Sequence, residues 1–165
     1  MTMNLADISI HKDSPRVVNA VIEIEKHSSI KYEYDKELGV FRYDRGLDSA
    51  MVYPANYGFI PGTYCDDGDA LDILVIAERP IDKGTLIEVR PLGVLDMNDD
   101  GFKDYKVLAV PVPTKRRFRN LDDVDPMFLR ICRNFFSHYK DLEGKKVVVG
   151  KWLNKQRAFD IIKKS

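Results

Sequence analysis

Cysteine, histidine and tryptophan are scarce in this chain of 165 residues, which contains two, three and one of them respectively. The two cysteines, Cys65 and Cys132, form at most one bridge, which excludes a disulfide framework. No stretch approaches the roughly 20 apolar residues of a membrane span, and the N-terminal segment lacks the apolar run of a signal peptide. We therefore expect a reduced, cytoplasmic protein with no membrane partner, forming one domain over residues 1–165.

A net charge is also lacking, because 26 lysines and arginines balance 26 aspartates and glutamates. Domains that bind nucleic-acid phosphates usually carry a basic excess. The absence of such an excess favours a protein with no nucleic-acid partner. Many charges of both signs without an excess also fit opposite charges that are concentrated in one site.

Short apolar runs separated by Gly and Asp clusters fill the first two-thirds of the chain and predict β-strands. Residues 17–24 and 30–35 alternate in polarity, whereas residues 71–76 are almost continuously apolar. Further strands are expected at residues 40–45, 87–97 and 105–110. Several short strands joined by such turns favour a closed or nearly closed antiparallel barrel.

The last third of the chain changes to a helical period. Asp125-Pro126 is a typical helix start, and an apolar stripe with helical spacing follows it at Phe128, Ile131, Phe135 and Tyr139. Residues 147–149 predict a short strand, and Asn154 is a candidate N-cap for a terminal helix. The expected fold class is therefore α+β, a small antiparallel β-barrel with two flanking helices.

The first of two acidic clusters is the segment Asp66-Asp67-Gly68-Asp69-Ala70-Leu71-Asp72. Four carboxylates in seven residues repel one another unless cations lie between them. A solvated acidic turn and a metal site are both open interpretations, because turns favour Asp for their own reasons. Oxygen ligands without nearby His or Cys ligands would favour Mg²⁺, Mn²⁺ or Ca²⁺ over Zn²⁺.

The second acidic cluster, residues 96–104, joins two predicted strands. Its start matches the D-x-N-x-D-G pattern of an EF-hand calcium loop. The match fails at the twelfth position, where Val107 replaces the required bidentate Glu, and strands flank the loop instead of helices. An acidic hairpin loop is the plainer interpretation.

Cationic residues accompany these acids, notably Lys31, Arg45, Lys106 and Lys140. Acids that hold metal, together with Lys and Arg that bind phosphate oxygens, are what phosphoryl transfer to water requires. A nucleotide or sugar phosphohydrolase would need the same groups. A nucleic-acid-binding barrel is a third interpretation, encouraged by the basic run at residues 115–119, although such runs are usually solvated loops.

A set of segments in order along the chain resembles the family I soluble inorganic pyrophosphatases, most closely the compact bacterial kind. The resemblance runs from Val18 to near Trp152, and it departs from the family at Ala70, where Pro or Glu is usual. That change removes a rigid φ but no ligand. The segments that carry the resemblance are residues 21–24, 30–33, 44–45, 53–58, 67–72, 99–106 and 135–141.

The resemblance implies a five-stranded, OB-like barrel with helices outside and a homohexameric assembly. It implies hydrolysis of pyrophosphate to two phosphates by a metal-activated water, without a covalent intermediate. The cofactor would be several Mg²⁺ ions per site, with Mn²⁺ as a substitute. The metal ligands would be Asp67, Asp69, Asp72, Asp99 and Asp104, supported by Glu23 and Glu33.

The resemblance also assigns roles to residues that act on the substrate. Asp69 would take the proton of the attacking water. With Asp69, the catalytic residues would be Lys31, Arg45, Tyr57 and Lys106. Phosphate oxygens would be bound by Lys31, Arg45, Tyr53, Tyr57, Lys106, Tyr139 and Lys140.

Overall fold

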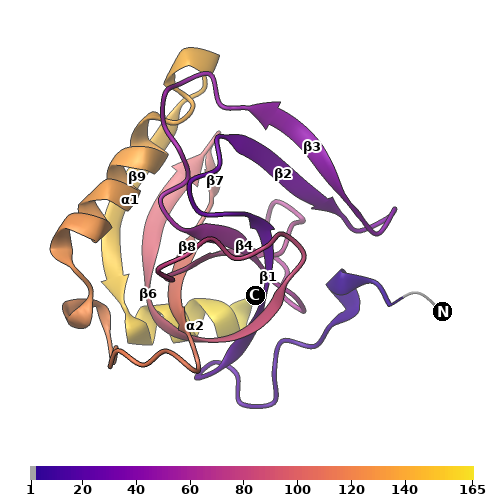
Figure 1. The fold of residues 1–165 in the computed structure, drawn as a ribbon, viewed down its shortest axis with the longest axis vertical. Coiled ribbons are helices and arrows are strands. Elements are labelled where there is room, and N and C mark those ends of the chain that lie inside the picture. Colours follow the sequence, from indigo (N-terminus) through magenta and orange to yellow (C-terminus); the bar gives the residue numbers. More distant parts are fainter. Residues whose placement is uncertain (1–2) are drawn as a thin grey trace.

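A mostly antiparallel sheet of seven strands forms the body of the computed structural model, which describes residues 3–165 (Figure 1). The strands hydrogen-bond in the order β1-β4-β5-β8-β6-β7, and β9 pairs with β6. Their bounds are β1 Val18–Ile24, β4 Asn56–Ile60, β5 Leu71–Val75, β6 Leu86–Asp99, β7 Phe102–Lys103, β8 Lys106–Pro111 and β9 Val147–Asn154.

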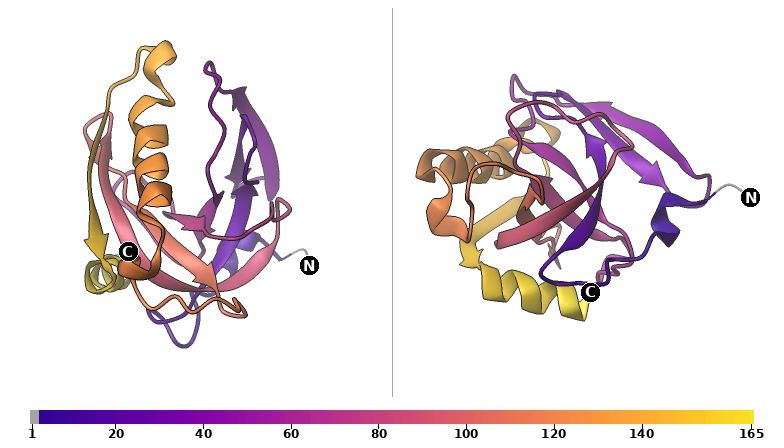
Figure 2. Two further views of the ribbon diagram at one scale, coloured as in Figure 1. Left: turned by 60° about the vertical axis from the view of Figure 1, so that its left-hand side comes forward. Right: turned by 60° about the horizontal axis from the view of Figure 1, so that its bottom comes forward.

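A separate two-stranded sheet consists of β2 (Ile30–Asp35) and β3 (Val40–Gly46). These two strands are the β2–β3 hairpin. In the left view of Figure 2 this hairpin lies opposite helix α1, which runs beside β9. The hairpin is therefore joined to the body by side chains and loops instead of by a backbone ladder.

Two α-helices cover the sheet, α1 (Pro126–His138) and α2 (Lys155–Lys164). Both predicted caps are confirmed, because the side chain of Asp125 accepts from the backbone N–H of Met127 and that of Asn154 accepts from Arg157. Helix α1 packs beside β9, and α2 packs against β6 and β9. Short 3₁₀ turns lie at η1 Leu5–Asp7, η2 Leu121–Asp123 and η3 Asp141–Glu143.

The strand pairing corrects part of the prediction of a closed or nearly closed antiparallel barrel, because the sheet is mostly but not wholly antiparallel and the barrel is not closed. Strands β5 and β8 run parallel, so the sheet is mixed. The pairing between β1 and β6 involves only residues 18–21 and 86–89. The α+β class and the two helices are confirmed. The parallel pairing was not predictable, because strand order and direction depend on contacts between segments that are distant in the sequence.

Strand β4 was missing from the sequence-based expectation, and β9 is longer than expected. Residues 56–60 lie between Pro54 and Pro61 and contain Gly58, all of which weaken a strand prediction. Residues 102–103 were expected in a loop but form β7. A tight turn at Asp100 (φ 51°) and Gly101 (φ 83°) joins β6 to β7. Two positive φ values are typical of a type I′ hairpin turn.

The core has two parts, which pack on different elements. One is aromatic and includes Tyr53, Phe135 and Phe136, with α1 over it. The other is aliphatic and includes Ile73 and Ile162, with α2 over it. Both cysteines are free. Within residues 3–165, no helix combines the length and apolar character needed to cross a membrane.

Gly58 provides a test of how closely β1 and β4 approach. A Cβ at this position would lie 1.8 Å from the backbone oxygen of Val21. Backbone atoms cannot move aside cheaply, so Gly58→Ala should lower the free energy of unfolding by about 3 kcal/mol or more. Urea denaturation measures this loss. The control is Gly46→Ala, where the nearest atom would be 3.9 Å away and little change is expected. Equal effects would contradict the close approach.

Candidate active site

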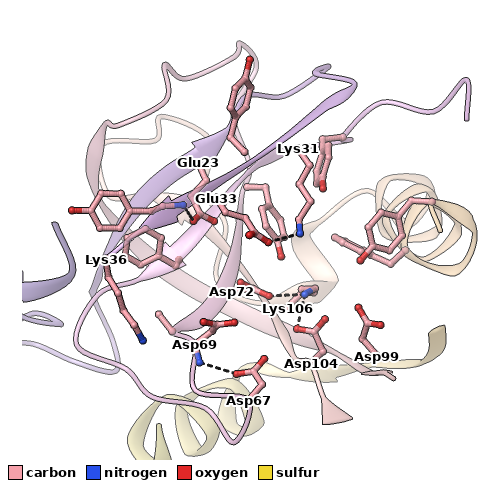
Figure 3. Close-up of a pocket in the computed structure, with 18 of the residues that line it drawn as sticks. Glu23, Lys31, Glu33, Lys36, Asp67, Asp69, Asp72, Asp99, Asp104 and Lys106 are labelled. Carbon is pink, nitrogen blue, oxygen red and sulfur yellow. Dashed lines mark hydrogen bonds and ion pairs between the residues drawn. The ribbon is translucent and has the colours of Figure 1, made fainter. Parts of the chain in front are cut away.

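A cavity of about 280 Å³ lies where the β2–β3 hairpin, the main sheet and the end of α1 meet (Figure 3). Every site residue predicted from the sequence lines it except Arg45. The structure thus brings together residues that are spread over more than 100 positions of the chain. The predicted residues in the lining are Glu23, Lys31, Glu33, Tyr53, Tyr57, Asp67, Asp69, Asp72, Asp99, Asp104, Lys106, Tyr139 and Lys140.

The floor of the cavity is an ion-paired trio formed by Asp72, Lys106 and Asp104. The parallel register of β5 and β8 sets Asp72 opposite Lys106, and Asp104 precedes Lys106 by two residues. The Nζ atom of Lys106 lies 2.6 Å from a carboxylate oxygen of each aspartate. Because Lys106 is only 2% exposed, its ammonium depends on these partners in place of water.

The trio has strongly perturbed ionisation. Burial alone would lower the pKa of Lys106, but the charges of Asp72 and Asp104 outweigh burial and raise it. Burial raises the pKa of Asp72 to about 6, against the opposing effect of Lys106. Burial would also raise the pKa of Asp104, but Lys106 more than offsets this and lowers it. Lys106 is therefore a permanent cation at neutral pH, suited to an anionic ligand.

The acidic loop before β5 presents Asp67 and Asp69 to the same cavity. Gly68 adopts a φ of 85° between them, a conformation that glycine tolerates best. The backbone N–H of Asp69 donates to Oδ1 of Asp67 at 3.0 Å, which folds the turn. Partial burial, followed by the charge of Asp67, raises the pKa of Asp69. A raised pKa increases the affinity of a carboxylate for a proton.

The hairpin contributes the opposite wall of the cavity. The Nζ atom of Lys31 lies 2.5 Å from Glu33 and 2.8 Å from Asp44. Glu23, on β1, accepts a hydrogen bond from the backbone N–H of Tyr34 at 2.9 Å. Burial raises the pKa of Glu23 to about 8, helped by the negative charges of Asp72 and Glu33.

Only part of the second acidic cluster, residues 96–104, lines the cavity. Asp99, near the end of β6, pairs with Lys140 just after α1, and both line the cavity together with Asp104. Asp96 instead pairs with Lys103 at 2.6 Å and does not line the cavity. Strands flank this turn, so the calcium-loop alternative has no structural support.

Aromatic rings form the remaining wall. The ring of Tyr53 packs on Phe135 with centroids 4.8 Å apart, and Tyr57 and Tyr139 complete the aromatic group. Lys106 Nζ lies 5.5 Å from the centroid of the Tyr57 ring. Burial raises the pKa of Tyr57 well above its ordinary value. Its hydroxyl therefore remains a neutral hydrogen-bond donor at the cavity.

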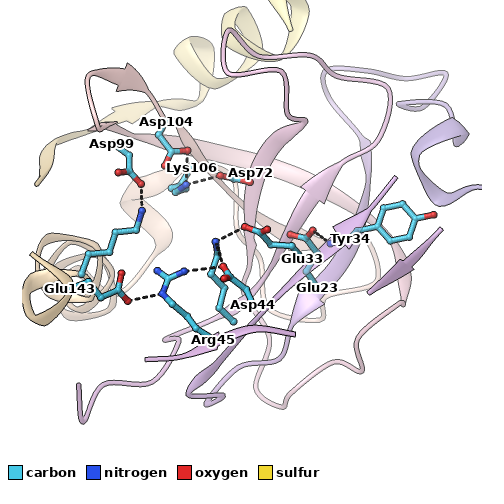
Figure 4. A network of polar contacts seen from close by, with 12 residues as sticks. Glu23, Glu33, Tyr34, Asp44, Arg45, Asp72, Asp99, Asp104, Lys106 and Glu143 are labelled. Atoms are coloured by element: carbon cyan, nitrogen blue, oxygen red, sulfur yellow. Dashed lines mark hydrogen bonds and ion pairs between the residues drawn. The ribbon is translucent and has the colours of Figure 1, made fainter. Parts of the chain in front are cut away.

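Three functional neighbours were not identified from the sequence. Lys36 lines the cavity, and its Nζ donates to the backbone oxygen of Gly68 at 3.0 Å. The sequence showed residues 35–39 only as a turn. Asp44 and Glu143 hold Arg45 (Figure 4). No sequence signal connects Glu143 to Arg45, because 98 positions separate them.

The basic run at residues 115–119 does not present an aromatic ring for stacking on bases. Phe118 is buried in the aromatic core, and the guanidinium of Arg116 packs over its ring. The backbone N–H of Arg119 donates to Asp123, so part of the run is tied to the neighbouring turn. These contacts favour the solvated-loop interpretation.

The cavity fits a hard divalent cation by its donor chemistry. Its acidic lining consists of carboxylates, with no histidine or cysteine among the lining residues. Within residues 3–165, however, no three His, Cys, Asp or Glu side chains converge as a ready-made cage. Lys106 pairs with Asp72 and Asp104, and Lys140 pairs with Asp99, so these carboxylates face lysines instead of one another. Mg²⁺ suits such an arrangement, because it commonly keeps several waters and binds through a few carboxylates and substrate phosphates.

Titration of Glu23 should be visible in stability measurements. A pKa of about 8 in the folded state exceeds the ordinary 4.5. The associated stabilisation is therefore complete below about pH 4.5 and is lost as pH rises through 8. Relative to Glu23→Gln, wild type should lose about 1 kcal/mol or more over this range in chelator. Parallel Tm curves for the two proteins would contradict this.

The whole chain resembles proteins of known family. The family model described as inorganic pyrophosphatase matches residues 20–165. An inorganic pyrophosphatase of Aeropyrum pernix is 46% identical over 93% of this chain and 90% of its own length. One of Rhodospirillum rubrum is 42% identical over 98% of this chain and 94% of its own length.

Solved structures agree with this match. The crystal structure of inorganic pyrophosphatase from Thermus thermophilus superposes with a TM-score of 0.94, at 37% identity, over 98% of this chain and 95% of that one. The inorganic pyrophosphatase of Helicobacter pylori gives a TM-score of 0.89 at 40% identity, over 95% of each chain. With the family model, the relatives and the fold in agreement, the chain belongs to the inorganic pyrophosphatase family.

Proposed function

We propose that the chain, as a member of this family, hydrolyses pyrophosphate to two phosphates with a water activated by Mg²⁺. The observation that carries this proposal is one cavity in which five aspartates face four lysines and five tyrosines. The metal would be held by Asp67, Asp69, Asp72, Asp99 and Asp104, with Glu23 and Glu33 in support. Mn²⁺ is the expected substitute, because it prefers the same oxygen ligands.

Bound Mg²⁺ would lower the pKa of a water toward roughly 7 and neutralise substrate charge. Asp69 is the proposed acceptor of the proton of the attacking water. Its raised pKa and its place on the acidic loop, beside Asp67, support this role. Proton transfer to a positioned carboxylate contributes about 10²- to 10⁴-fold to rate. Because water attacks phosphorus directly, no side chain forms a covalent intermediate.

Lysines, an arginine and tyrosines would bind the phosphate oxygens. Lys106 and Lys140 approach from the sheet and the end of α1, and Lys31 approaches from the hairpin. Arg45 would join them from β3. The neutral hydroxyls of Tyr53, Tyr57 and Tyr139 would donate hydrogen bonds. Together these groups stabilise the charge on the equatorial and leaving oxygens during transfer.

Family membership also supports proposals for the domain organisation, the location and the oligomeric state of the protein. We propose that residues 1–165 act as one domain in the cytoplasm. The proposed assembly is a homohexamer. The exposed Met127 and Ile131 on α1 support a contact there, since apolar surface favours association. A monomeric mass in light scattering would contradict the hexamer.

Metal dependence tests the proposed chemistry. Phosphate release from pyrophosphate should require added Mg²⁺ and fall by at least about 100-fold in excess chelator, because without the metal the water is too weakly acidic for Asp69 to deprotonate. Circular dichroism should change little, since the carboxylates belong to the cavity and not to the apolar core. ATP and a sugar phosphate serve as comparison substrates. Full turnover in chelator would rule out the metal mechanism.

Two aspartates on β6 test the assignment of the second acidic cluster. Asp99→Asn should lower kcat by about 100-fold or more, because a proposed metal ligand becomes neutral. Asp96→Asn, a matched change three residues earlier, should leave kcat within about twofold, since Asp96 pairs with Lys103 outside the cavity. The reverse pattern would overturn the assignment, and Tm values of both variants control for folding.

A further inference from the structure

Arg45 is the one predicted site residue that is not among the residues lining the cavity. Its Nε atom donates to Oε1 of Glu143 at 2.6 Å, and Nη1 donates to Oδ2 of Asp44 at 2.9 Å. The third nitrogen, Nη2, is buried and has no hydrogen-bond partner in residues 3–165. Two of the three guanidinium nitrogens are thus fixed by carboxylates.

An unpaired buried donor on a cation is unfavourable, so native structures rarely contain one without a reason. Glu143, which holds the guanidinium, lies on the same segment as Tyr139 and Lys140, and these two residues line the cavity. The unpaired nitrogen therefore belongs to a guanidinium that Glu143 ties to the segment bearing two cavity residues.

A bulge in β3 prepares this arrangement. Lys31 pairs with Arg45 while the next residue, Tyr32, pairs with Tyr43, which leaves Asp44 as the extra residue. Bulges re-aim side chains, often beside active sites. Here Asp44 contacts Arg45 on one side and Lys31 on the other. The bulge thus brings one carboxylate between two cations (Figure 4).

Glu143 supplies the second hold on Arg45, from a different part of the fold. It ends the turn η3, which follows the end of α1 and the residues Tyr139 and Lys140. Its side chain is only 9% exposed. A carboxylate so poorly hydrated needs its ion partner, which makes the geometry of the pair well defined. The contact joins β3 of the hairpin to the helix end across the cavity.

We propose that Glu143 is a positioning residue for phosphate binding. It fixes the guanidinium of Arg45 relative to Tyr139 and Lys140, the cavity residues of its own segment, so that the three side chains can act on one phosphate group. This inference rests on the proposed role of Arg45 in the site. Glu143 itself touches no substrate and acts only through Arg45.

The test compares Glu143→Leu and Glu143→Gln with wild type in pyrophosphate hydrolysis at saturating Mg²⁺. Glu143→Leu should lower kcat/KM by about tenfold, mostly through a higher KM, because a misoriented Arg45 loses a charge-assisted hydrogen bond to the substrate. Glu143→Gln keeps an acceptor oxygen and should lose about threefold or less. Glu37→Gln, at the exposed turn of the same hairpin, is the control and should not change kcat/KM.

A double-mutant cycle separates positioning from simple bracing of the fold. In an Arg45→Ala background, Glu143→Leu should change kcat/KM by less than about twofold, because the residue it positions is gone. Its Tm should rise in that background, since Leu replaces an unpaired buried carboxylate. The same tenfold loss with and without Arg45 would overturn the proposal. So would an unchanged kcat/KM with a lowered Tm. A wild type that releases no phosphate would instead contradict the proposed function.

Discussion

The buried ammonium of Lys106 is the constraint around which the site is arranged. An isolated charge at 2% exposure would be strongly destabilised, so the fold must deliver carboxylates to it. The parallel pairing of β5 and β8 places Asp72 beside Lys106, and the residues just before β8 supply Asp104. The two aspartates are in turn tolerable beside each other because the cation lies between them. Loss of any one member would leave the others unbalanced.

The balance of charges that gives the chain a net charge of zero is repeated within the cavity. The cavity gathers acidic and basic side chains, and in the structure these groups neutralise one another. Lys140 with Asp99 and Lys31 with Glu33 repeat the pattern of the Lys106 trio. Such pairs keep charged groups in place inside a low-dielectric wall of tyrosine and phenylalanine rings. The site is thus organised by electrostatics that its own side chains balance.

The sequence predicted the parts of this site better than it predicted their connections. Alternation identified β1 and β2, and capping residues identified both helices, because these signals are local. Strand β4 was not predicted, because its flanking prolines and Gly58 weaken the local signal for a strand. Pairing with β1 and β5 nevertheless stabilises this strand in the fold. The parallel direction of β5 and β8 has no local signature. Neither does the contact between Arg45 and Glu143.

The positions of individual site residues followed the same division. The acidic loop stood out because four aspartates in seven residues are unusual, and its members do line one cavity. Lys36 was passed over as part of a turn, although it reaches Gly68. Glu143 lies among ordinary charged residues, and only three-dimensional proximity distinguishes it. Composition and spacing reveal candidate ligands, whereas the residues that hold those ligands in place emerge from long-range packing.

The β2–β3 hairpin has a consequence for how the protein moves. It shares no backbone ladder with the main sheet, so it can detach locally while the sheet stays intact. What resists that opening includes the ion pair from Arg45 to Glu143 and the stacking of Tyr34 on Phe59. Dissolved salt screens so poorly hydrated an ion pair only weakly, and it does not weaken ring stacking. Opening of the hairpin would therefore vary little with ionic strength, while amide exchange would still be faster in the hairpin than in β5 and β8.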